Sequence, residues 1–163
     1  MKISLAVEVA VRPEEVFSWL DDPEKAMLWQ KGVKKAEIIQ ETPDRIGTTF
    51  VEEMEEDGNA LQMHGVITAY APNRMIAFHL ESRIHQVDAC YSIVEEDGCS
   101  VVRVESSVRW KFPMNMISLI IGRRIKEGIL KQMQEELGQL RMRCEEEKRG
   151  GLANEESVIS QAG

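Results

Sequence analysis

Hydrophobic residues recur every four positions over the last long segment of the chain, from Pro113 to about Arg149. The recurring positions are Ile117, Ile121, Ile125, Ile129, Met133 and Leu137. This spacing places them on one face of an α-helix, opposite a charged face. At 1.5 Å per residue such a helix is roughly 50 Å long, and no earlier segment predicts a helix of similar length. The pattern therefore predicts a long C-terminal helix that packs against a β-sheet.

The residues before this helix mostly alternate between hydrophobic and polar side chains, which is typical of half-buried β-strands. Residues 2–11 form the first expected strand, and two short amphipathic helices follow it over residues 14–20 and up to Gly32. A second strand is expected over residues 33–41. Five antiparallel strands joined by short turns are expected from Gly47 onward. The predicted fold class is α+β.

Four turns join these five strands, and they are centred on Asp57-Gly58, Pro72-Asn73, Arg83-Ile84 and Asp97-Gly98. A two-residue turn fixes which residues face each other on the two strands. The turn at Asp97-Gly98 pairs Ile93 with Val102, and the turn at Pro72-Asn73 pairs Ala69 with Ile76. Because every such pairing puts apolar residues together, we expect one hydrophobic face on the sheet.

These elements predict a curved antiparallel sheet of about seven strands, with the long C-terminal helix across its hydrophobic face. The two short helices follow the first strand. A strongly twisted sheet seldom meets a helix along its whole length, so a cavity between them is expected. Residues 1–149 are expected to form one domain. Residues 150–163 are short and polar, and we expect a disordered tail there.

Composition excludes several classes of protein. The chain has 163 residues, 43% of them hydrophobic and 29% charged, with a net charge of −8, which argues against a nucleic-acid surface. Its three cysteines predict no disulfide framework and favour a reducing cytoplasm. Neither a signal peptide, a membrane span nor a zinc-binding cysteine pair is expected. We expect a monomer or weak dimer without a cofactor, a metal ion, integral membrane association or a nucleic-acid partner.

Three stretches of the sequence, in this order, resemble the START-like (SRPBCC) superfamily. They read VRPEEVFSWLDDPEKAMLWQKGV, then GVITAYAPNRMIAFHLES, then VRVESSVRWKFP running into the last helix. The resemblance covers roughly residues 1–147. This superfamily includes polyketide cyclases and dehydrases, lipid-transfer proteins and the birch-pollen allergen. The resemblance implies the helix-grip fold and a pocket for a hydrophobic small molecule or lipid, without a universal catalytic motif.

Glu52 is the candidate catalytic residue. It alternates in phase with Phe50 and Met54, so it shares the hydrophobic face with them. A carboxylate that faces an apolar cavity has a raised pKa and can act as an acid or a base. The alternative is that Glu52 lies near the mouth of the cavity or pairs with a cation such as Arg45 or Arg124.

The candidate ligand-binding residues are aromatic, aliphatic or polar side chains expected on the hydrophobic face, on the second short helix or on the long helix. His85, expected beside Trp110, would meet a polar group of the ligand or serve as a structural residue at the rim. For the aromatic and methionine side chains, the alternative is a role in the core. The full set is Trp29, Phe50, Met63, Phe78, His85, Tyr91, Val104, Ser106, Trp110, Ile117, Ile121 and Ile125.

Three functions fit these features. The favoured one is a carrier or sensor of a small hydrophobic ligand such as a lipid or polyketide, which needs only a pocket. The second is a cyclase, aromatase or dehydratase, a lyase or isomerase in which Glu52 transfers a proton. The third is an interaction module similar to the co-chaperone branch of the superfamily, which would use the outer face of the sheet.

Overall fold

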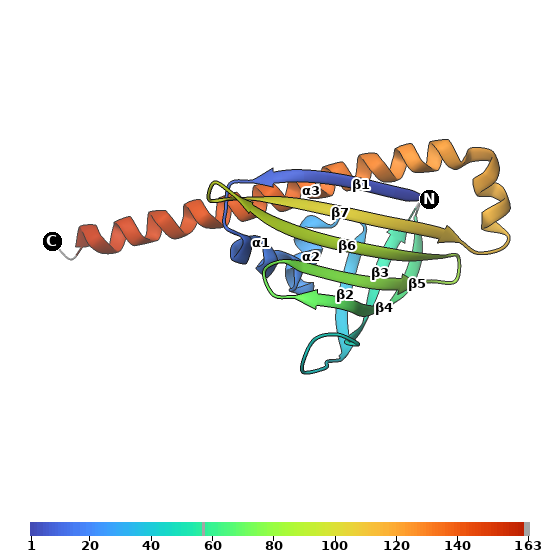
Figure 1. Cartoon of the computed structure of the whole chain (residues 1–163), viewed down its shortest axis with the longest axis horizontal. Helices are drawn as coiled ribbons and strands as arrows, with labels where there is room; N and C mark the ends of the chain where they lie inside the picture. Colours follow the sequence, from blue (N-terminus) through green and yellow to red (C-terminus); the bar gives the residue numbers. More distant parts are fainter. Residues whose placement is uncertain (57, 162–163) are drawn as a thin grey trace.

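The computed structural model describes residues 1–56 and 58–161 (Figure 1). The helices in this part of the chain are α1 (Pro13–Leu20), α2 (Pro23–Trp29) and α3 (Met114–Gln161). The strands are β1 (Lys2–Val9), β2 (Val33–Gln40), β3 (Thr49–Glu56), β4 (Asn59–Ala71), β5 (Met75–Glu81), β6 (His85–Glu96) and β7 (Cys99–Trp110). The strands form one antiparallel seven-stranded sheet in the order β1-β7-β6-β5-β4-β3-β2, and α3 runs along it. The predicted helix-grip fold is confirmed.

Local sequence signals explain why α1 and α2 begin where they do. Each has a proline at its first helical position, where the missing backbone N–H costs nothing. At the start of α1, the Glu15 carboxylate accepts a hydrogen bond from the Arg12 backbone N–H at 2.9 Å. At the start of α2, Asp22 accepts one from the Glu24 N–H at 2.9 Å. These caps satisfy backbone groups that would otherwise lack partners, so the chain can turn sharply between β1 and β2.

The register predicted from the turns is largely confirmed. Ile93 pairs with Val102 as expected, while Ala69 pairs with Ala77 rather than with Ile76. The reason is that the loop between β4 and β5 contains three residues, 72–74, instead of a two-residue turn. A shift in the ladder between Ile67 and Ala69 compensates for the extra residue, so the pairs further from the loop keep the predicted register. In the predicted turn at Asp57-Gly58, Asp57 lies outside the described residues.

The main hydrophobic core lies between the sheet, the two short helices and part of α3. Its fully or almost fully buried members include Val9, Val16, Val102, Leu140 and Cys144. A smaller cluster at β4 and β5 contains Leu61, Met63 and Leu80. The structure therefore has one well-packed region and one smaller hydrophobic cluster.

Helix α3 is longer than the sheet that it covers. Its 48 residues span roughly 70 Å, whereas a strand of 12 residues spans roughly 40 Å. In Figure 1 its first turns are angled away from the rest of the helix, and its last turns extend beyond the sheet. The helix continues to Gln161 instead of ending near residue 149, and residues 146–161 are exposed. The domain boundary at residue 149 stays a prediction.

Candidate functional site

A cavity of about 220 Å³ lies between the sheet and α3. Strands β3 to β7 form one wall of the cavity. Residues of α3, together with Gln30 and Gly32, form the rest of its lining. The predicted site residues that line it are Glu52, Met63, Phe78, His85, Tyr91, Val104, Ser106 and Trp110. Because these residues come from five different strands, the shared sheet face that the sequence predicted is what brings them together.

Two predicted aromatic residues lie next to this cavity without lining it. Trp29 is buried in the core, where its indole N–H donates a hydrogen bond to the Trp19 carbonyl at 3.2 Å. Phe50 packs edge-on against Phe78, with 6.1 Å between ring centroids. A side chain at Gly65 would collide with the Phe50 ring, because a Cβ there would lie 2.2 Å from it. The glycine thus lets the ring lie flat on the sheet.

The predicted residues of the long helix are displaced from the cavity. Ile117 and Ile121 are each 44% exposed on the first turns of α3, and neither they nor Ile125 line the cavity. The helix contributes instead Ile129, Gln132, Met133 and Glu136. The hydrophobic stripe therefore reaches the cavity one to three turns later than the sequence suggested.

Glu52 lies on β3, opposite Met63 of β4, and it lines the cavity. No described residue forms a hydrogen bond or an ion pair with its carboxylate. Burial raises the pKa of Glu52 from 4.5 to about 7, and the nearby charge of Glu136 adds to this shift. Near neutral pH, Glu52 can therefore both accept and release a proton.

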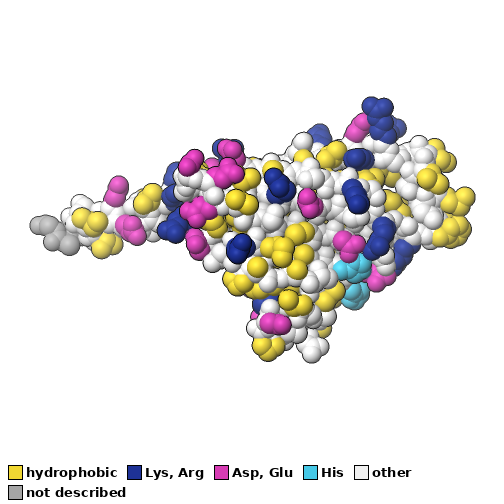
Figure 2. Space-filling model, viewed as in Figure 1, with side chains coloured by type: hydrophobic (Ala, Val, Ile, Leu, Met, Phe, Trp, Pro, Cys, Tyr) yellow, Lys and Arg dark blue, Asp and Glu magenta, His cyan; other side chains and the backbone are white. Residues whose placement is uncertain are grey.

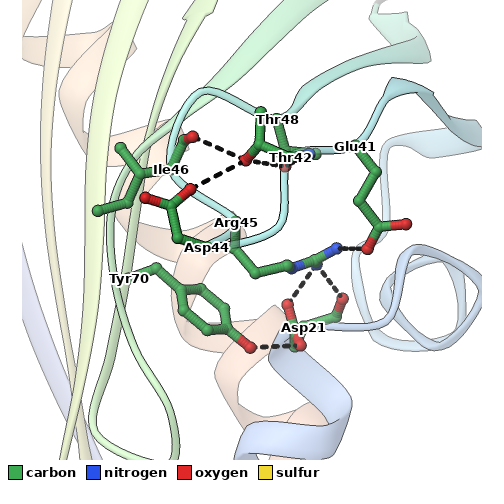
Figure 3. A network of polar contacts seen from close by, with 8 residues as sticks. All are labelled: Asp21, Glu41, Thr42, Asp44, Arg45, Ile46, Thr48 and Tyr70. Atoms are coloured by element: carbon green, nitrogen blue, oxygen red, sulfur yellow. Dashed lines mark hydrogen bonds and ion pairs between the residues drawn. The ribbon is translucent and has the colours of Figure 1, made fainter.

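The two cations considered as partners of Glu52 lie elsewhere. Arg124 is exposed on α3. Arg45 binds Asp21 at 2.6 Å and Glu41 at 2.7 Å, and Tyr70 donates a hydrogen bond to the same Asp21 carboxylate at 2.8 Å (Figure 3). The positive charge of Arg45 is thus neutralised by two other carboxylates, and the structure does not contain the ion pair that the sequence left open for Glu52.

Glu136 is a cavity residue that the sequence analysis missed. It lies on α3 three residues after Met133 and seven after Ile129, so helical spacing alone places it on the same face. Its carboxylate accepts hydrogen bonds from the Gln132 side chain at 2.9 Å and the Lys31 backbone N–H at 3.1 Å. Burial nevertheless raises the pKa of Glu136 above its usual value. Glu136 therefore adds to the cavity a second carboxylate whose pKa is raised by burial, beside Glu52.

Tyr91 adds a hydroxyl group beside the two carboxylates. Burial raises the pKa of Tyr91, and the charges of Glu136 and Glu52 raise it further. The hydroxyl group therefore keeps its proton and can donate a hydrogen bond at any physiological pH.

His85 and Trp110 form a second polar group. His85 lies six residues before Tyr91 on β6, which corresponds to roughly 20 Å along the strand. Burial, together with the charge of Lys111, lowers the pKa of His85, so its ring is neutral at pH 7. Its Nδ1 lies 3.2 Å from the Ser82 hydroxyl, and its ring is 5.1 Å from that of Trp110. The buried Trp110 indole N–H has no acceptor among the described residues, so a ligand oxygen would be its natural partner.

Residues 1–56 and 58–161 contain neither a metal-binding cluster nor a membrane-spanning helix. No three His, Cys, Asp or Glu side chains in this part of the chain lie close enough together to hold a metal ion. No helix there combines the length and apolarity that crossing a membrane requires.

Comparison with known proteins agrees with the fold. The family described as "Polyketide cyclase / dehydrase and lipid transport" matches residues 1–145. The chain belongs to this family. No curated protein sequence matches it. Family and fold together support a hydrophobic-ligand-binding protein of the START-like (SRPBCC) superfamily.

Solved structures with the same fold differ widely in sequence. A protein from Thermus thermophilus has a TM-score of 0.76 at 13% identity, covering 88% of this chain and 97% of its own. A START superfamily protein from Mycobacterium smegmatis has a TM-score of 0.75 at 21% identity, covering 89% and 97%. The di-domain ARO/CYC StfQ from the steffimycin biosynthetic pathway has a TM-score of 0.74 at 15% identity, covering 92% of this chain and 52% of StfQ. At these identities the likeness extends to the fold alone.

Proposed function

We propose that this family member binds a small hydrophobic molecule in the cavity between the sheet and α3. The observation that carries the proposal is the cavity itself, whose lining is mainly aliphatic, aromatic and methionine side chains. Such a surface gains free energy when an apolar molecule displaces water from it. The volume of about 220 Å³ is below the roughly 300–1,000 Å³ of pockets for drug-sized ligands, so a short alkyl chain or a single ring is the fitting size.

The second candidate function is enzymatic, and one observation favours it. Glu52 has a pKa of about 7 in an apolar cavity, which suits a general acid or base at neutral pH. Tyr91 would hydrogen-bond the reacting group, and Glu52 would move the proton. A cyclase or dehydratase reaction has this requirement, and one structural relative is an ARO/CYC protein.

A pair of tryptophan substitutions on α3 tests the proposed binding site. Ile129 lines the cavity, so Ile129→Trp should fill it, whereas Ile121 is exposed outside it. We expect Ile129→Trp to weaken the binding of 1-octanol, measured by calorimetry, by at least about tenfold, or 1.4 kcal/mol. Ile121→Trp should change the dissociation constant by less than about twofold, because surface substitutions rarely alter a distant site.

Both variants are checked for native secondary structure and melting temperature before binding is compared. Equal binding of 1-octanol to the native chain and Ile129→Trp would overturn the proposed site. So would loss of binding in Ile121→Trp alone.

A further inference from the structure

All charged side chains that line the cavity have the same sign. The charged residues of the lining are Glu52, Glu55 and Glu136, and the described lining contains neither lysine nor arginine. Glu55 has a partner, since its carboxylate lies 3.7 Å from the Lys34 ammonium group. Two carboxylates therefore remain in the cavity without a counter-ion.

Two cations outside the cavity lining, Arg45 and Lys31, are already paired with other acids. Arg45 binds Asp21 and Glu41. The Lys31 ammonium group lies 3.0 Å from Glu135, and Lys31 hydrogen-bonds Glu136 only through its backbone N–H. To neutralise the cavity carboxylates, Arg45 or Lys31 would have to give up an existing ion pair.

The two carboxylates come from opposite walls, Glu52 from the sheet and Glu136 from α3. Each is near enough to the same ring, that of Tyr91, to influence its hydroxyl group. Tyr91 stacks on Phe78, with 5.9 Å between ring centroids. Carboxylates beside aromatic faces are the surroundings in which proteins hold organic cations, because both attract positive charge.

We propose that the ligand is a cationic amphiphile, a small hydrophobic molecule with one protonated amine held between Glu52 and Glu136. This inference rests on the proposed function, namely that the cavity binds a hydrophobic molecule. The ammonium group supplies the missing counter-charge and up to three hydrogen-bond donors, while the apolar part occupies the rest of the cavity. A ligand carboxylate in the same position meets two like charges and is rejected.

The same geometry makes binding of the amine dependent on pH. The groups that face Glu52 are Glu136 from α3 and the protonated Tyr91 from β6. Glu136 in turn faces Gln132, Glu135 and the charge of Lys31. Since the pKa of Glu52 is about 7, acidification below pH 7 removes its negative charge, while an alkylamine with a pKa near 10 stays protonated. Affinity for the amine therefore falls as the pH decreases from 8 to 5.5.

Three probes with the same alkyl chain separate the two proposals. 1-Octanol, octylamine and octanoate are titrated calorimetrically into the full chain at pH 8. We expect octylamine to bind about 10- to 100-fold more tightly than 1-octanol, the range for a charge-assisted hydrogen bond, and octanoate to bind most weakly. Binding of 1-octanol without preference for octylamine overturns the cation proposal and leaves the hydrophobic site standing. Absence of binding by all three overturns the proposed function itself.

Matched variants localise the preference. Glu52→Gln and Glu136→Gln should each reduce the ratio of octylamine affinity to 1-octanol affinity by at least about tenfold. Glu53→Gln is the control, because Glu53 is the exposed neighbour of Glu52 on β3. An unchanged advantage in both cavity variants shows that octylamine binds the acidic surface, which overturns the proposal.

The unsubstituted protein provides a further test, which does not require any variant to fold. Between pH 8 and pH 5.5, its octylamine affinity should fall by about tenfold, while its 1-octanol affinity stays constant. A pH-independent ratio of the two affinities contradicts the proposal.

Discussion

Two segments of the same helix have the same hydrophobic period but different surroundings. We call residues 114–128 of α3 the leading segment and residues 129–144 the packed segment. In the leading segment Leu119 is 86% exposed and Ile120 is 85% exposed, whereas in the packed segment Leu140 is fully buried and Leu137 is 4% exposed. Hydrophobic spacing therefore predicts where a helix forms, but it does not reveal how much of that helix meets the sheet.

Figure 2 shows this difference on the surface. Hydrophobic side chains gather at the end of the molecule where Figure 1 places the first turns of α3. The exposed large hydrophobic residues of that region are Phe112, Met116, Ile117, Leu119, Ile120 and Ile121. In the packed segment the corresponding side chains line the cavity or the core. Ligand binding and stability should thus both depend on the packed segment.

The largest expected effect is on stability. Leu140→Ala removes a fully buried side chain from the core and should lower the free energy of unfolding by about 2–5 kcal/mol. Leu119→Ala, the same change in the leading segment, should alter it by less than about 0.5 kcal/mol. Urea titrations of the two variants measure both values. Similar losses for the two leucines would show that the leading segment packs as well.

The next effect concerns the cavity carboxylate and depends on pH. Glu52 has a folded pKa of about 7 against 4.5 when unfolded, so between these values the folded state binds more protons and stability decreases as the pH rises. Above pH 7 the full penalty applies, and at 1.36 kcal/mol per pKa unit it amounts to roughly 3 kcal/mol. Glu52→Gln should therefore be neutral at pH 4 and stabilising by up to about that amount at pH 8.

Melting temperatures measured from pH 4 to pH 8 test this expectation. Glu53→Gln serves as the control, because Glu53 is exposed and does not line the cavity. A stability difference between native and Glu52→Gln protein that stays constant with pH would contradict the burial of the charge.

The smallest effect is expected at the far end of α3, where residues 150–161 are exposed. The contacts that tie α3 to the first part of the chain lie before this end: Glu145 accepts from the Ala10 N–H and Lys148 donates to the Ala10 carbonyl. A chain that ends at Arg149 should lose less than about 1 kcal/mol, or roughly 2–4 °C in melting temperature. A larger loss would place the domain boundary beyond residue 149.

Much of the sheet could be predicted because strand alternation and turn length constrain each other. The phase of Glu52 with Phe50 and Met54 predicts that it faces the cavity, and it lines the cavity. The predicted pairing of Ala69 with Ile76 was wrong because the loop has three residues instead of two. A bulge compensates for the extra residue, so the pairs further along the strand keep the predicted register. Neither feature has a distinctive hydrophobic pattern, so the sequence could not separate them from a simple turn.

The contribution of the helix to the site was harder to predict. Ile117, Ile121 and Ile125 fit the hydrophobic stripe as well as Ile129 does, and only the finite length of the sheet distinguishes them. Glu136 was overlooked because a glutamate in a charged helix is normally solvated, although its spacing from Met133 placed it on the inner face. Arg45 was considered as a partner of Glu52, but its real partners, Asp21 and Glu41, approach it only in the folded chain.

The most direct test of the ligand site uses the methionine methyl groups as reporters. The chain has nine methionines, of which Met63 and Met133 line the cavity, while Met116 is 58% exposed in the leading segment. With methyl-labelled protein, nuclear Overhauser effects from 1-octanol should appear at Met63 and Met133 and be absent at Met116. Contacts from 1-octanol to Met116, without contacts to Met63 and Met133, would show that the ligand binds the exposed end of α3 and would contradict the proposed cavity site.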